Sequence, residues 1–189
     1  MNLKTRMNDV MNGPSRSPVK GSRIFAGAMA AWFIFIAVDF LLHAVILAGW
    51  WKATESYWLP PAELFRMIPI GYASFAIYCV VLTWLFVRIR GDSRTLVSAV
   101  KFGAAAGLVF GAVLILANYS VFRLPVSSLL VWPAFFLIES MCACAVASLV
   151  LDSERPWRRV GLAFGVALLL LIIGVVLQNP VSYTHLRAH

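Results

Sequence analysis

Charged residues are scarce in this sequence, and that scarcity excludes an ordinary soluble domain. Only 13% of the 189 residues are charged and 61% are apolar, whereas soluble domains have about 25% charged and about 45–50% apolar residues. The apolar residues also fall into long runs, and about 20 residues of helix are enough to cross a hydrocarbon core. We therefore predict an all-α transmembrane helical bundle.

Cysteine and histidine are also rare, which limits redox and metal chemistry. The three cysteines, Cys79, Cys142 and Cys144, lie inside apolar runs, so we interpret them as small packing residues rather than a disulfide framework. His43 is the one histidine that lies in an apolar run, and a single histidine cannot form a bis-histidine haem site. The sequence also lacks the common hydrolase, metalloprotease, phosphate-loop and dinucleotide motifs. We predict no catalytic residue, metal or cofactor.

The last nine residues, 181–189, differ in character from the rest of the chain and read VSYTHLRAH. They resemble one reading frame of a transposon-end adapter used to build sequencing libraries. The resemblance implies that residues 179–189 form a non-native tail and that the true C-terminus is missing. We therefore set aside His185 and His189, although their spacing of four suits a helical metal pair.

Five apolar stretches are predicted to cross the membrane: residues 24–50, 67–87, 96–117, 126–151 and 160–177. The polar, Gly- and Pro-containing residues 1–23 are predicted to be a disordered basic tail, and residues 24–178 the transmembrane domain. The first stretch is longer than the apolar region of a signal peptide, about 7–15 residues, so we expect it to remain as an anchor. Pro69 is expected in the first turn of the second span, where a missing N–H is tolerated.

The distribution of basic residues predicts the orientation of these spans. Lys and Arg number twelve in the N-terminal tail and the second and fourth loop regions, against three on the other side, Lys52, Arg66 and Arg123. Because cytoplasmic loops carry the excess of Lys and Arg, we predict a multi-pass inner-membrane protein with its N-terminus inside. The tryptophans between residues 50 and 58 then lie at the outer headgroups. This placement explains the net charge of +8 without nucleic-acid binding.

Small residues at every fourth position predict close contacts between helices. Gly103, Gly107 and Gly111 share one face of the third span, and Gly161 and Gly165 repeat the spacing in the fifth. Lipid tails are as apolar as Leu, so helices in a bilayer associate through close backbone approach and polar contacts. We predict that the stripe faces another helix. That helix can belong to the same chain, a second copy or another membrane protein.

Polar residues within the spans form the candidate site. Asp39 and His43 are four residues apart and share a helix face, and Glu139 with Ser140 lies near the middle of the fourth span. At about 1.5 Å per residue, Asp39 lies roughly 16 Å, Glu139 roughly 20 Å and His43 roughly 10 Å below the outer face. These depths allow the first and fourth spans to bring the three together. Pro133 is predicted to bend the fourth span above Glu139.

Two interpretations of this cluster stay open. Carboxylates and an imidazole at this depth can act as a proton relay or bind a small cation or polar substrate, which predicts small-solute or proton-linked transport. Alternatively, His43 bonds Asp39, Glu139 is protonated, and the cluster only holds two helices in register. On that interpretation the chain is a non-catalytic membrane subunit, assembly factor or sensor. The sequence gives little support to a membrane-embedded enzyme.

Two features between residues 24 and 151 carry a family resemblance. One is Asp39-Phe-Leu-Leu-His43 leading to Trp50-Trp51, and the other is residues 101–107, KFGAAAG, followed by Leu124-Pro125 and Trp132. The layout resembles small bacterial inner-membrane proteins of the domain-of-unknown-function kind. The resemblance implies a membrane fold and location, but no particular activity.

Overall fold

The structure, a computed structural model, describes residues 19–91, 95–121 and 126–178. Within these residues every regular element is helical, as predicted. The elements are α2 (Gly21–Leu41), the π-helix η1 (Leu42–Ile46), α3 (Ala48–Ala53), the 3₁₀-helix η2 (Glu55–Tyr57), α4 (Pro61–Arg90), α5 (Leu96–Val121), α6 (Val126–Leu151) and α7 (Pro156–Gln178). Five helical segments, with α2 and η1 counted as one, are long and apolar enough to cross a membrane. The chain is therefore an integral membrane protein built as a helical bundle.

The later helices cover the predicted spans, and α4, α5 and α7 extend beyond them. Helix α6 has the predicted bounds, and α5 begins at the predicted Leu96. Helix α4 begins at Pro61 rather than at residue 67, because proline is well suited to the first position of a helix. Pro69 consequently lies inside α4 and not in its first turn, which corrects the sequence-based expectation. Helix α7 likewise begins at Pro156.

The first predicted span is not one continuous α-helix. Helix α2 begins at Gly21, so the last residues of the predicted disordered tail are helical, while residues 1–18 lie outside the described part of the chain. After Leu41 the backbone widens into the π-helix η1, where the Leu47 N–H donates to the Leu42 carbonyl at 2.9 Å. The end of α7 reaches this segment, and the side-chain amide of Gln178 donates to the Ala44 carbonyl at 3.0 Å.

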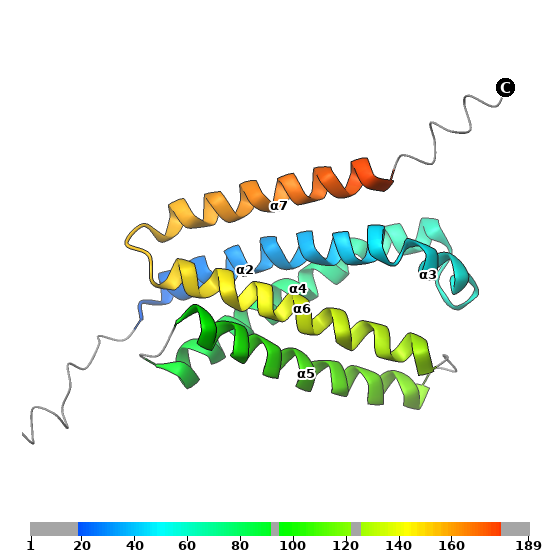
Figure 1. Cartoon of the computed structure of the whole chain (residues 1–189), viewed down its shortest axis with the longest axis horizontal. Coiled ribbons are helices and arrows are strands. Elements are labelled where there is room, and N and C mark those ends of the chain that lie inside the picture. The colour runs from blue at the N-terminus through cyan, green and yellow to red at the C-terminus, as the bar shows by residue number, and fades with distance from the viewer. Residues whose placement is uncertain (1–18, 92–94, 122–125, 179–189) are drawn as a thin grey trace, which may run out of the picture.

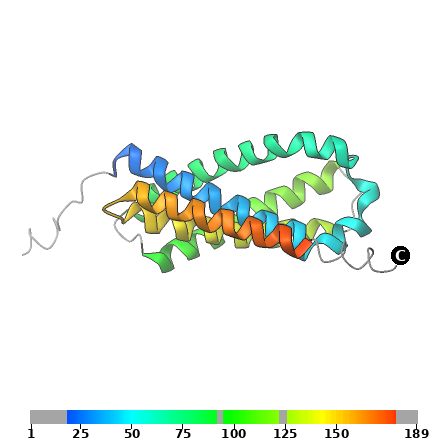
Figure 2. The ribbon, with the colours of Figure 1, turned by 90° about the horizontal axis from the view of Figure 1, so that it is seen from above.

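Helix α2 is the central element of the bundle. It packs against α4, α6 and α7, whereas α5 packs mainly on α6. In Figure 1, α7, α2, α6 and α5 lie side by side with α4 behind them, and Figure 2 shows the same bundle from above. The buried face of α2 is rich in alanine, including Ala26, Ala30, Ala31 and Ala37. These small side chains allow three helices to approach α2 closely.

The buried apolar side chains form two clusters on either side of α2. One cluster joins α2 to α4, α5 and α6 around Phe35 and Phe86, and the other joins α2 to α6 and α7. Cys79 and Cys144 are packed in the first cluster, and both are free thiols, as is Cys142. The cysteines of the chain thus serve as packing residues, as the sequence indicated.

The glycine stripe of α5 faces α6 of the same chain. A Cβ atom on Gly107 would lie 2.7 Å from the Leu137 Cα, and one on Gly111 would lie 2.7 Å from the Pro133 Cβ. A Cβ on Gly103 would collide with the Ser140 backbone in the same way. The two backbones therefore meet without intervening side chains. Pro133 lies at this contact, within a helix that runs on from Val126 to Leu151.

Helix α7 packs through a different face from the one that its glycines suggest. A Cβ on Gly161 or Gly165 would meet nothing within 4 Å in the described structure. The buried residues of α7 instead include Ala163 and Ala167, and two residues further along a helix correspond to about 200° around its axis. The predicted contact through Gly161 and Gly165 thus finds no partner helix within the described chain.

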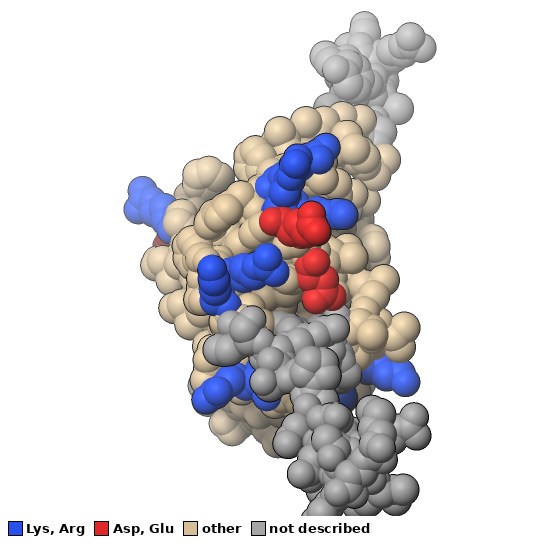
Figure 3. Space-filling model, turned by 90° about the vertical axis from the view of Figure 1, so that its left-hand side faces the viewer, with Lys and Arg blue, Asp and Glu red and all other residues tan. Residues whose placement is uncertain are grey.

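Charged side chains gather at one end of the bundle. This end is shown in Figure 3 and lies at the left of Figure 1. Its described basic residues are Lys20, Arg23, Arg88, Arg90, Lys101, Arg155, Arg158 and Arg159. The Arg23 guanidinium donates to the Leu151 carbonyl at 3.4 Å and so connects the start of α2 to the end of α6. The asymmetry read from the sequence is therefore also present in space.

Candidate intramembrane polar site

Asp39, His43 and Glu139 meet at the junction of α2, η1 and α6. One carboxylate oxygen from each acidic residue and one ring nitrogen of His43 lie within 4.8 Å of one another. Glu139 is buried with 1% of its surface exposed, while the side chains of Asp39 and His43 are 16% and 23% exposed. The structure thus brings together the three residues whose depths along the first and fourth spans are similar.

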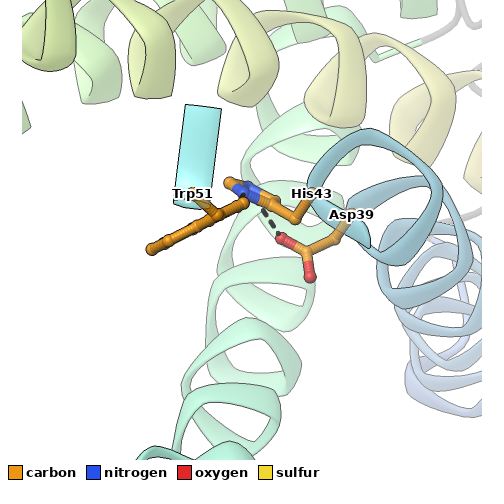
Figure 4. Close-up of polar contacts among 3 residues, drawn as sticks. All are labelled: Asp39, His43 and Trp51. Carbon is orange, nitrogen blue, oxygen red and sulfur yellow. Dashed lines mark hydrogen bonds and ion pairs between the residues drawn. The ribbon is translucent and has the colours of Figure 1, made fainter. Parts of the chain in front are cut away.

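The His43 ring has a different partner at each of its nitrogens (Figure 4). Its Nε2 lies 3.5 Å from the Asp39 Oδ1, and the indole N–H of Trp51 donates to its Nδ1 at 3.3 Å. A nitrogen that accepts a hydrogen bond carries no proton, so the neutral ring holds its proton on Nε2, on the side of Asp39. Trp51 therefore selects the form of His43 that directs an N–H toward the carboxylate.

The break after η1 places Trp51 against His43. Leu47 follows the π-helix with φ −95° and ψ 7°, outside the helical geometry, and across this break Trp51 of α3 contacts the His43 ring. The ring of Trp51 lies 4.7 Å from that of Trp58, which in turn lies 5.5 Å from Trp132 on α6. Sequence reasoning assigned the tryptophans of this region to the headgroups only. Nothing in the apolar sequence 42–46 signals the π-helix that redirects the chain.

The three polar residues line a cavity of about 190 Å³. Its other walls are one side chain from α4, one from α5 and three from α6, namely Phe75, Leu114, Trp132, Phe135 and Phe136. At roughly 30 Å³ per water molecule, the cavity has room for about six waters. The sequence did not identify these aromatic residues as part of the site, because their convergence depends on how the helices pack.

Glu139 has an unusual environment for a buried carboxyl group. Its Oε1 atom has no hydrogen-bond partner among the described residues. Leaving a buried polar atom unsatisfied costs about 1–3 kcal/mol, and more if the group is charged. Such exceptions are rare in native structures. Glu139 therefore combines a place in the cavity wall with a carboxyl oxygen that has unused capacity for a hydrogen bond.

Ser140 is adjacent to Glu139 in sequence but does not line the cavity. Its hydroxyl forms a 2.8 Å hydrogen bond with the Tyr78 hydroxyl on α4. The Tyr78 ring also packs against Phe35 and Phe136. Ser140 thus joins α6 to α4, while Glu139 faces the polar cluster.

The atoms of this cluster are also of the types that bind metal ions. One carboxylate or imidazole atom from each residue lies within 4.8 Å of the other two, and zinc binds nitrogen and oxygen atoms at about 2.0–2.2 Å. Because the Trp51 N–H occupies Nδ1 of His43, the imidazole nitrogen left for a cation is Nε2, beside Asp39, after release of its proton. The cluster can therefore take a proton, a water molecule or a cation.

Comparison with known protein families, curated proteins and solved structures found no match for this chain. The functional interpretation therefore rests on the cavity, the unsatisfied carboxyl atom and the two bonds of His43. The resemblance to small bacterial inner-membrane proteins stays a prediction.

Proposed function

We propose that this chain is a transporter that moves a small solute across the inner membrane with coupled proton movement at Asp39, His43 and Glu139. The observation that carries the proposal is the Glu139 Oε1 atom, which is buried and has no hydrogen-bond partner in the described structure. It belongs to a residue that lines the same cavity as Asp39 and His43.

The geometry of His43 supports a role in proton transfer. Its Nδ1 faces Trp51 in the connecting segment and its Nε2 faces Asp39 in α2. The indole N–H of Trp51 does not release its proton, so the proton that His43 can exchange is the one on Nε2, which faces Asp39. Asp39 and Glu139 lie close enough to repel each other when both are charged, so binding a proton or a cation between them is favourable.

The proposed location is a bacterial inner membrane with the N-terminus in the cytoplasm. Support comes from the basic side chains that gather at the end of the bundle where α2 begins, because Lys and Arg are enriched on the cytoplasmic side. The cavity then lies nearer the outer side, below Trp50 and Trp51 of α3 and Trp58 after η2.

Proteoliposomes that contain a pH-sensitive dye test the proposal. We expect at least one solute in a panel of amines, amino acids, sugars and organic acids to accelerate proton movement down an imposed pH gradient. The variants Asp39→Asn and Glu139→Gln should abolish this flux while still inserting into the membrane. The matched control is Glu63→Gln, because Glu63 is an exposed carboxylate at the start of α4. Wild-type flux in both site variants would contradict the proposal.

The alternative is a membrane subunit, assembly factor or sensor, and one observation favours it. A Cβ atom added to Gly161 or Gly165 of α7 would meet nothing within 4 Å in the described structure. Exposed glycines on one helix face suit close contacts with another helix in lipid. The partner would be a second copy of the chain or another membrane protein. Co-purification of two differently tagged copies tests the homo-oligomer, and Gly165→Leu should abolish it. Unchanged co-purification would rule out this face as the contact.

A further inference from the structure

The walls of the cavity are largely aromatic. Phe75 contributes from α4, and Trp132, Phe135 and Phe136 contribute from α6. The faces of aromatic rings carry partial negative charge and attract a cation held within about 6 Å of the ring centre. An inorganic ion gains little from such walls, since they offer no oxygen donors. A ligand with both a positive charge and apolar surface can contact these rings through its apolar part and the carboxyl groups through its charge.

The charged residues that line the cavity are acidic. Asp39 and Glu139 are its carboxyl groups, and neither Lys nor Arg is among the residues that line it. His43 does not supply a compensating positive charge in this arrangement, because its Nδ1 accepts the Trp51 hydrogen bond and leaves a single ring proton on Nε2. A cationic ligand is therefore the partner that neutralises this pair of carboxyl groups.

From this combination we propose that the cavity binds a small organic ammonium ion. The positive nitrogen lies against the carboxylates of Asp39 and Glu139, and its methyl or methylene groups contact the aromatic wall. The volume of about 190 Å³ limits the ligand to a small one, since drug-sized ligands need about 300 Å³ or more. The proposal rests on the proposed transport function, for which it names the class of solute.

A pair of isosteric probes tests the proposal on the wild-type chain. Choline carries a quaternary ammonium group, and 3,3-dimethyl-1-butanol has the same shape without the charge. The full chain is purified in detergent, and each probe is titrated while tryptophan fluorescence and the melting temperature are recorded. We expect saturable binding of choline and at least about tenfold weaker binding of the neutral alcohol, because a charge contact to a carboxylate is lost. This comparison needs no variant and so cannot fail through misfolding.

Variants then locate the binding site. Trp132→Leu removes one aromatic face and should weaken choline binding about fivefold to thirtyfold, and Glu139→Gln should weaken it at least about tenfold. The controls are Trp157→Leu and Glu63→Gln, which alter an exposed tryptophan and an exposed carboxylate outside the cavity. Both controls should bind choline with the affinity of the wild type.

Three results would overturn the proposal. The first is equal binding of choline and the neutral alcohol, and the second is choline binding that Trp132→Leu and Glu139→Gln leave unchanged. The third is the absence of saturable choline binding, whether or not Zn²⁺ binds at this site. Proton flux with a non-amine solute, but no choline binding, would refute the ligand class and keep the transport function. Choline binding without any coupled flux would refute transport and keep the binding site.

Discussion

Replacing Gly107 by alanine tests the direct backbone contact between α5 and α6. The added Cβ would lie 2.7 Å from the Leu137 Cα and 2.9 Å from the Phe136 carbonyl oxygen. Carbon atoms in contact are normally about 3.5–4.0 Å apart, and both neighbours are backbone atoms that cannot rotate away. The helices must therefore separate by roughly 1 Å. Overpacking of this kind costs about 1–3 kcal/mol, and we expect the free energy of unfolding to fall by that amount less the gain of up to about 1 kcal/mol from the helix propensity of alanine.

The matched control is the same exchange at Gly165 of α7. A Cβ there meets nothing within 4 Å in the described structure, and alanine favours a helix over glycine by up to about 1 kcal/mol. Gly165→Ala should therefore be no less stable than the wild type. The difference between the two variants isolates the contact with α6 from the general effect of adding a methyl group.

Reversible unfolding in mixed micelles, followed by tryptophan fluorescence, measures both variants. The molar mass of the protein should stay unchanged for Gly107→Ala, because the glycine stripe contacts a helix of its own chain. Wild-type stability of Gly107→Ala would refute the reasoning. Equal destabilisation of both variants would refute it too.

Three further predictions use the same unfolding assay or a topology reporter. Thr83→Val removes a buried hydroxyl that has no partner among the described residues, so the variant should be as stable as the wild type or up to about 1–3 kcal/mol more stable; a clear loss would contradict this. Tyr78→Phe removes the bond to Ser140 and should cost about 0.5–1.5 kcal/mol, whereas no change would show that the bond contributes nothing. A periplasm-dependent reporter should be active when fused after Gln178 and inactive after Ser153, and the reverse pattern would invert the proposed orientation.

The apolar pattern was sufficient to predict most of the fold. A backbone in lipid must satisfy its polar groups internally, so a long apolar run is necessarily helical, and α6 has the bounds expected from its run. The pattern failed where helices continue into polar sequence. Glu63 and Arg66 belong to α4, although their charge placed them in a predicted loop. Ala26 and Ala30 of α2 are also small residues four apart and are buried, but the sequence analysis predicted close helix contacts only from the glycines.

The candidate site was predictable only in part. The helical rise gives similar depths to Asp39 and Glu139, and this estimate identified residues that meet in space. It could not show the role of Trp51, because that role depends on the π-helix and on the break at Leu47. It could not show the aromatic wall either, since Phe75 reaches the cavity from α4 and Trp132 from α6. Convergence of side chains from several helices is a property of tertiary packing.

The hydrogen bond from Gln178 to the Ala44 carbonyl gives the last turn of α7 a mechanical connection to the site. Ala44 follows His43 directly, within the widened turn, and backbone carbonyls near the end of a helix lack their usual helical donors. The side chain of Gln178 supplies such a donor from the far end of the sequence. The same stretch of α7 also packs directly on α2, since a Cβ on Gly174 would lie 2.6 Å from the Phe40 ring. The Gln178 amide therefore adds a polar tie to an apolar contact, and Gln178→Ala would remove that tie without altering any residue that lines the cavity.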